Sequence, residues 1–133
     1  MSRRGLREKT FRLLFRKEFY DEKDFLSQKD LFFSDEEQLE MTEEEVSFVK
    51  ETCDKIREKL PRIDESISEK TTGWNIDRIG KAELAILRLA VYEIMFDDSI
   101  PPSVSINEAV ELAKKYGADD ASSFVNGVLA KFV

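Results

Sequence analysis

Apolar residues recur along this chain at intervals of three and four, the spacing of one face of an α-helix. The segment 84–96 is apolar at almost every position and is interrupted only by Arg88 and Glu93. Five glycines and three prolines leave few points at which such patterns are broken. The sequence therefore predicts an all-α protein without β-strands, with a central helix over 81–96 in which Arg88 and Glu93 are hydrogen-bonded within the structure.

Helix start and stop signals divide the rest of the chain. Thr42 with Glu45, and Ser105 with Glu108, are spaced as capping boxes, and Asp120 stands where it can cap the last helix. Gly127, inside that last helix, suggests close approach of another backbone. We expect helices over about 3–20, 23–33, 42–60, 61–72, 81–96, 105–116 and 121–132, with an acidic connection over 34–45.

The chain has the length and apolar content of one domain, since 41% of its 133 residues are hydrophobic. Gly73 suggests a division into an N-terminal helical subdomain, 1–73, and a C-terminal one, 74–133. The lone Cys53 excludes an internal disulfide, no cleavable leader is recognisable, and the segment 84–96 is too short to span a membrane. These features predict a cytoplasmic protein with no membrane partner.

Charge is strongly segregated along the chain. Residues 1–17 carry seven cations and one acid, a charge of +6, so the remainder carries −13 within a total of −7. Clustered cations attract phosphates, whereas an acidic body repels nucleic acid and suits a basic protein. The sequence thus indicates one nucleic-acid partner and one basic protein partner. Phe15 borders the basic residues, where its ring either stacks on a base or packs in the core.

Several kinds of chemistry are excluded by what the chain lacks. It has no histidine, which removes the usual general base and the commonest transition-metal ligand. Cys53 lies in an apolar stripe without a partner for catalysis or zinc binding. The five glycines are too dispersed for a phosphate-binding loop. We therefore predict that the protein is not an enzyme and uses neither metal nor cofactor.

Three ordered segments and the basic amino terminus are similar to a known family. The segments read AILRLAVYE at 85–93, INEAVELAK at 106–114 and FVNGVL at 124–129, and arginines are concentrated at 3–14. Together they resemble the NusB family of bacterial transcription antitermination factors, while residues 21–73 fit only in helical pattern. The resemblance implies about seven helices in two packed subdomains. It also implies binding of single-stranded boxA RNA of ribosomal RNA leaders together with the ribosomal protein NusE, in an antitermination complex on RNA polymerase.

The resemblance also implies which residues bind. Position 15, a phenylalanine here, is one where relatives often carry an RNA-contacting tyrosine. The implied RNA contacts are Arg3, Arg4, Arg7, Phe15, Asp120 and Phe124, and the implied NusE contacts are Glu83 and, more weakly, Asp77.

Two other functions fit parts of the same pattern. A NusB-like domain also forms the RNA-binding part of some ribosomal RNA cytosine methyltransferases, and this chain could be such a domain cut from a longer protein. A helical adaptor that acts only through proteins could use the basic segment for an acidic partner or for self-association. Salt-dependent binding to boxA-like RNA separates the adaptor from the antitermination factor.

Overall fold

A computed structural model describes residues 1–17, 41–71 and 75–133. Within these ranges the chain is helical and contains no strand, which confirms the predicted all-α fold. The helix predicted over 23–33, most of the acidic connection over 34–45 and the end of the first helix lie outside the described residues. The elements are α1 (Arg3–Lys17), α3 (Glu43–Glu58), α4 (Leu60–Lys70), the 3-10 helix η2 (Ile76–Arg78), α5 (Lys81–Phe96), α6 (Pro102–Tyr116) and α7 (Ala121–Ala130).

The chain forms two compact units, Met1–Lys55 and Ile56–Val133. The boundary between them falls within the last turn of α3, so α4 belongs with the C-terminal helices. The subdomain division expected near Gly73 remains a prediction, because residues 72–74 are not among those described. The two units are treated separately below.

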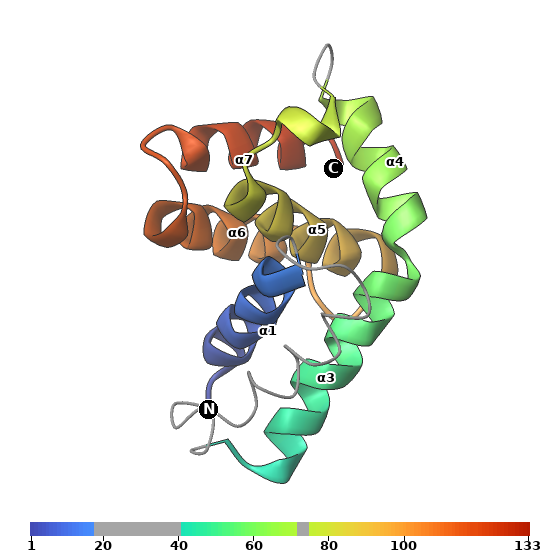
Figure 1. Ribbon diagram of the computed structural model, residues 1–133, viewed down its shortest axis with the longest axis vertical. Helices are drawn as coiled ribbons and strands as arrows, with labels where there is room; N and C mark the ends of the chain where they lie inside the picture. The colour runs from blue at the N-terminus through green and yellow to red at the C-terminus, as the bar shows by residue number, and fades with distance from the viewer. Residues whose placement is uncertain (18–40, 72–74) are drawn as a thin grey trace. The chain divides into compact units, whose positions relative to one another are not determined.

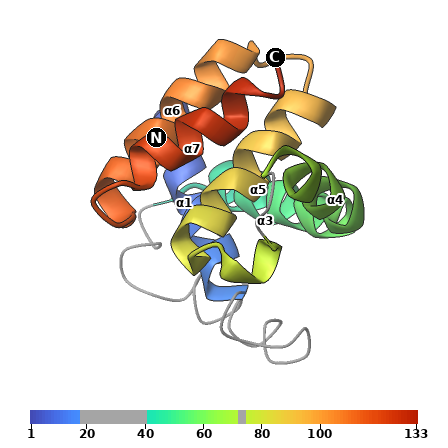
Figure 2. The same cartoon turned by 90° about the horizontal axis from the view of Figure 1, so that it is seen from above.

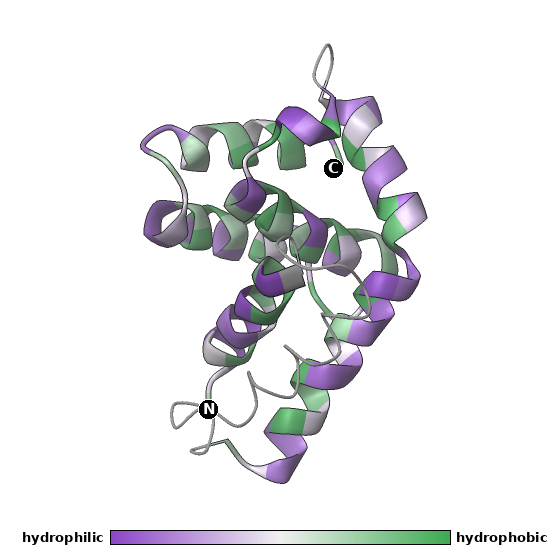
Figure 3. Cartoon of the chain, viewed as in Figure 1, coloured by the Kyte–Doolittle hydropathy of each residue, from purple (hydrophilic) through white to green (hydrophobic). Residues whose placement is uncertain are grey.

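Helix α5 is the centre of the second unit. It packs against α4, α6 and α7, and α6 and α7 also lie side by side (Figures 1 and 2). Figure 3 shows α5 as largely hydrophobic, whereas α4 alternates between hydrophobic and hydrophilic residues. Helix α5 has the bounds that the sequence predicts, because its apolar residues are buried on nearly every side rather than along one stripe. Its fully buried side chains are Ala85, Ile86, Leu87 and Val91.

The two charged residues of α5 that face the interior are both paired, as the sequence predicts. Arg88 donates to both carboxylate oxygens of Asp64 on α4, from Nε to Oδ1 and from Nη2 to Oδ2, each at 2.9 Å. Glu93 accepts a 2.7 Å hydrogen bond from the hydroxyl of Ser105 on α6, and both residues are buried. These pairs hold α4 and α6 in register with α5.

Arg88→Met is expected to lower the free energy of unfolding by about 2 kcal/mol, because it leaves a half-buried carboxylate without its partner. Urea denaturation of the single variants, Arg88→Met and Asp64→Asn, and of the double variant measures the coupling between the two side chains. If Arg88→Met costs as much in the Asp64→Asn background as in the parent, the ion pair contributes nothing to stability.

In the first unit, the predicted capping box at the start of α3 is confirmed. The Thr42 hydroxyl accepts from the Glu45 N–H at 3.1 Å, and Glu45 Oε1 accepts from the Thr42 N–H at 2.9 Å. Glu45 Oε2 also lies 2.7 Å from the Met1 amino group. Hydrogen bonding to the Met1 amino group, followed by the bond from Thr42, lowers the pKa of Glu45. The carboxylate is thus kept charged at the positive end of α3.

Other local expectations are wrong, and each has a physical reason. Ser105 does not start a helix, because Pro101 and Pro102 begin α6 one turn earlier and the Ser105 hydroxyl bonds Glu93 instead. Asp120 occupies the N-cap position of α7 without a side-chain capping bond. A Cβ atom at Gly127 would meet nothing within 4 Å, so close backbone packing does not explain this glycine.

Candidate nucleic-acid interface

The basic amino terminus forms the first turns of a helix. Ser2 Oγ accepts a 3.0 Å hydrogen bond from the Gly5 N–H, and the Ser2 carbonyl accepts from the Leu6 N–H at 3.0 Å. Ser2 therefore caps α1, and the helix begins at Arg3. The arginines that follow are presented on a regular helix, which fixes their spacing before any partner binds.

Helix α1 separates a buried apolar face from its charged residues. Phe11, Leu13 and Leu14 are at most 2% exposed, and the buried Thr10 hydroxyl donates to the Leu6 carbonyl at 2.9 Å. Outside this buried face, Arg3 and Arg4 are exposed and Arg7 is half-buried. The first turn of the helix contains no acid.

The cations of the first turn are placed unfavourably for the helix itself. Arg3 and Arg4 lie at the end of α1 where the peptide dipoles already leave positive partial charge. Arg7 follows Arg3 by four residues and Arg4 by three, so the three side chains are neighbours on the helix surface. This arrangement raises the local positive potential and suits an anionic ligand such as a phosphate backbone.

Phe15 lies partly at the surface, unlike its neighbour on the same helix. Its ring centre is 5.7 Å from that of Phe11, and the ring planes are inclined at 59°. Phe11 is 1% exposed, whereas Phe15 is only half-buried. The ring of Phe15 thus packs against the buried ring of Phe11 and keeps part of its own surface accessible to solvent. A base could stack there, but the role of Phe15 remains a prediction.

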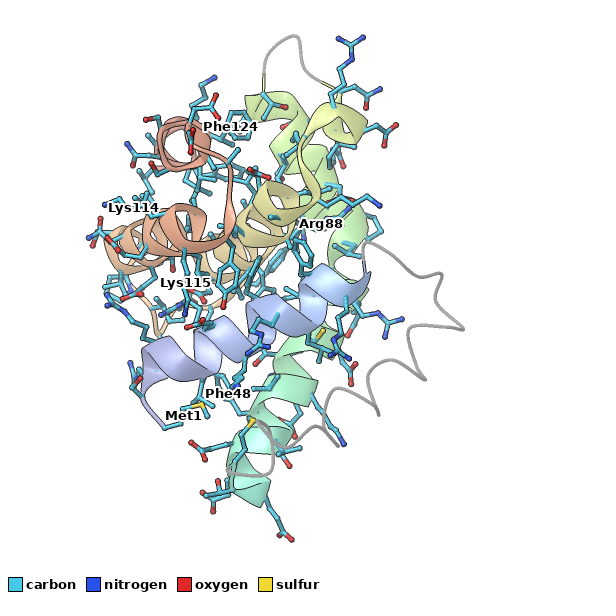
Figure 4. All side chains as sticks on the ribbon, turned by 60° about the vertical axis from the view of Figure 1, so that its left-hand side comes forward. Met1, Phe48, Arg88, Lys114, Lys115 and Phe124 are labelled. Atoms are coloured by element: carbon cyan, nitrogen blue, oxygen red, sulfur yellow. The ribbon has the colours of Figure 1, made fainter. Side chains whose placement is uncertain are left out.

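The start of α7 brings together the two RNA residues predicted in the C-terminal half. Asp120 is exposed, Phe124 is half-buried one turn later, and the Asp120 carbonyl accepts from the Phe124 N–H at 3.1 Å. Two further cations, Lys114 and Lys115, are exposed in the last turn of α6. Figure 4 shows these lysines on α6 and Phe124 on α7, two helices that pack together. Lys114 also lies 3.4 Å from a carboxylate oxygen of Glu111.

Glu83, expected to face a protein partner, also has a contact within the fold. Its Oε1 accepts a 3.1 Å hydrogen bond from the Ala118 N–H, in the loop between α6 and α7. A Cβ atom at Gly80 would clash with the carboxylate, whereas one at Gly117 would first meet Ala121 and the Ala113 carbonyl oxygen. Gly80 therefore leaves room for the Glu83 side chain. The carboxylate ties the first turn of α5 to the loop that leads to Asp120.

Asp77, the weaker protein-contact candidate, is exposed in η2. Its N–H donates to Asn75 Oδ1 at 3.3 Å, which caps this short helix. Arg3, Arg4, Arg7 and Phe15 thus share α1 in the first unit, whereas the remaining predicted residues, Asp77, Glu83, Asp120 and Phe124, all lie in the second.

Neither a metal-binding cluster nor a membrane-spanning helix occurs among the described residues. Across residues 1–17, 41–71 and 75–133, no group of three or more Cys, Asp or Glu side chains is arranged to hold a metal ion. None of the helices in these ranges is long and apolar enough to cross a membrane.

Comparisons with known proteins identify relatives along almost the whole chain. The profile of the NusB family matches residues 4–133. The transcription antitermination protein NusB of Agathobacter rectalis is 52% identical over 132 residues, which cover 99% of both chains. The solved structure of NusB from T. maritima has a TM-score of 0.84 at 32% identity, with 99% of this chain and 90% of that chain covered.

A further solved structure contains partners. It is described as the antitermination factors NusB and NusE in complex with double-stranded RNA, and it matches with a TM-score of 0.81 at 30% identity. The match covers 98% of this chain and 94% of the other. With a family profile over nearly all residues and a relative above 50% identity, the chain belongs to the NusB family of transcription antitermination proteins.

Proposed function

We propose that this protein is a transcription antitermination factor that binds boxA-type RNA of ribosomal RNA leader transcripts together with NusE. It acts in the cytoplasm, in a complex on RNA polymerase. The relatives named as antitermination proteins and the solved complex of a relative with NusE and RNA support this proposal.

The RNA-binding part of the proposal rests on the positive charge of α1. On a chain of net charge −7, helix α1 presents three neighbouring arginines at its positive end without an acid in its first turn. Arginines at the positive end of a helix destabilise the isolated helix. They become favourable once bound phosphates neutralise their charge. The solubility of an acidic protein does not require such clustering.

The function is tested by transcription in vitro through a terminator downstream of a boxA element. We expect the protein and NusE, added together to RNA polymerase with the other antitermination factors, to increase read-through. A template with a scrambled boxA is the control and should show no increase. Equal read-through from both templates, or none from either, would contradict the proposal.

The NusE side of the proposal rests on acidic residues of the second unit. NusE is expected to be a basic ribosomal protein, and Glu83 and Asp77 lie on elements that follow each other directly in the chain, α5 and η2. Both residues reach the surface, since Glu83 is half-buried and Asp77 is exposed. Charges of this kind mainly increase the association rate of oppositely charged proteins.

Two substitutions separate the partner contact of Glu83 from its contact within the fold. Glu83→Gln keeps an oxygen acceptor for the Ala118 N–H but removes the charge. We expect this variant to melt like the parent and to bind NusE about tenfold more slowly at low salt. Glu83→Ala should bind NusE equally slowly and also lose about 1 kcal/mol of stability, because the hydrogen bond is gone.

Stopped-flow association with NusE and thermal unfolding measure the two effects. Asp98→Asn is a matched control, since it removes one exposed carboxylate after the opposite end of α5. A Glu83→Gln variant that associates with NusE at the parental rate would rule out Glu83 as part of the protein-binding surface.

A further inference from the structure

A second concentration of positive charge lies in the second unit, away from α1 in the sequence. Lys59 directly precedes α4, Arg62 lies in its first turn, and Phe96 is the last residue of α5. The Lys59 Nζ lies 5.4 Å from the centre of the Phe96 ring, and the Arg62 Cζ lies 5.3 Å from the same point. We call these three residues the Phe96 cluster.

The Phe96 ring is positioned by the packing of α4 against α5 and by its neighbour Tyr92. Helices α4 and α5 pack against each other, and the Phe96 ring centre is 6.0 Å from that of Tyr92 one turn earlier. Phe96 and Lys59 are half-buried, whereas Arg62 is exposed. Contact with the ring orients the two cations, and Arg62 is accessible to a ligand.

In the part of the chain that the structure describes, Lys59 and Arg62 form no ion pair, and the nearest acids in the chain after Phe96 are Asp97 and Asp98. Helix α4 has no acid in its first turn and no side-chain cap, so its dipole adds positive potential at the same place. Two like charges, the amino terminus of α4 and the carboxyl terminus of α5 therefore meet at one aromatic ring.

We propose that the Phe96 cluster is a second RNA-binding site, which takes phosphate groups of a single strand. Guanidinium groups bind phosphate oxygens in pairs, and a lysine adds a mobile positive charge. Grooves for single-stranded nucleic acid combine such cations with aromatic rings. Because both cations lie over one ring, the separation between Lys59 Nζ and Arg62 Cζ cannot exceed the sum of their distances from the ring centre. The two cations can therefore bind neighbouring phosphates. An acidic protein segment would match the same charge, and binding to polyglutamate tests for it.

This inference rests on the RNA-binding function proposed above and assigns it a contact outside α1. A structural role is the competing explanation, because α5 has no basic residue in its last turn and cations stabilise a helix carboxyl terminus. A structural role predicts a loss of stability on substitution, whereas a binding role predicts a change in the salt dependence of RNA affinity.

The test uses the full chain and a boxA RNA extended on both sides. We expect Lys59→Gln with Arg62→Gln to reduce the logarithmic salt slope of binding by about 1.4, which corresponds to about 20-fold weaker binding near 0.1 M salt. The control, Lys70→Gln with Arg78→Gln, removes one lysine and one arginine of the same unit that do not share a ring. It should change the slope by less than half as much. Thermal unfolding of all variants accompanies the titrations.

The outcomes are distinct. An unchanged slope with a lower melting temperature, or equal slope changes in the two double variants, would overturn the second site. So would a double variant that keeps its RNA slope but loses binding to polyglutamate, since the cluster would then serve an acidic protein. The triple variant of Arg3, Arg4 and Arg7 is titrated in parallel. If only that variant loses RNA binding, the proposed function stands and the Phe96 cluster alone is wrong.

Discussion

Replacing Arg3, Arg4 and Arg7 together with alanine is expected to weaken binding to single-stranded boxA RNA about 100-fold near 0.1 M salt. Each phosphate contact contributes about 0.7 to the logarithmic salt slope of a single strand, so the slope should fall by about 2. The three side chains are neighbours on α1, and none is needed for its buried face. Fluorescence anisotropy at several salt concentrations measures both quantities.

A matched variant shows whether the position of the charges matters. Lys55, Lys70 and Arg78 are three cations outside α1, and their alanine substitution removes the same total charge. We expect the slope of this control to stay within 0.7 of the parental value. If both triple variants lose the same slope, the protein binds RNA through its overall charge and α1 is not the interface.

The second large effect concerns two aromatic residues on the same helix. Phe11→Ala is expected to lower the free energy of unfolding by about 3 to 5 kcal/mol, because the ring is 1% exposed. Phe15→Ala should cost less than half of that, since its ring is only half-buried. It should instead weaken RNA binding about tenfold, which is the size of one base-stacking interaction.

Urea denaturation and RNA titration of both variants test this division. Phe15→Leu is a useful companion, since it fills most of the apolar volume but has no ring to stack on a base. It should bind RNA as weakly as Phe15→Ala while remaining more stable. A Phe15→Ala variant that is as unstable as Phe11→Ala and binds RNA normally when folded would place Phe15 in the core alone.

Features set by neighbouring residues in the chain could be predicted from the sequence. Helix α5 has its predicted bounds because a mostly apolar segment begins shortly after Gly80 and ends before Asp97. The capping box of Thr42 and Glu45 depends on residues three positions apart and is also correct. The positive charge of α1 could be predicted from the number and positions of its charged residues alone. The same local rule failed at Ser105, because the hydroxyl has a better partner in a buried carboxylate on another helix.

Contacts between distant residues could not be predicted in the same way. The sequence indicated that Arg88 is paired but did not identify Asp64, 24 residues earlier. Glu83 was interpreted as a surface acid, and its bond to the Ala118 N–H, 35 residues later, follows only from the packing of α5 against the α6–α7 loop. The Phe96 cluster likewise exists only because α4 and α5 pack together.

RNA and NusE are expected to bind this protein together, and RNA titrations in the presence and absence of NusE measure whether they do. Labelled boxA RNA and a scrambled RNA of equal length are titrated with the protein, with and without its host's NusE, at two salt concentrations. We predict that NusE tightens binding to boxA RNA at least tenfold more than binding to the scrambled RNA, and that higher salt weakens every complex. Equal affinity for the two RNAs in the presence of NusE, or RNA binding that is insensitive to salt, would contradict the account and favour an adaptor that acts only through proteins.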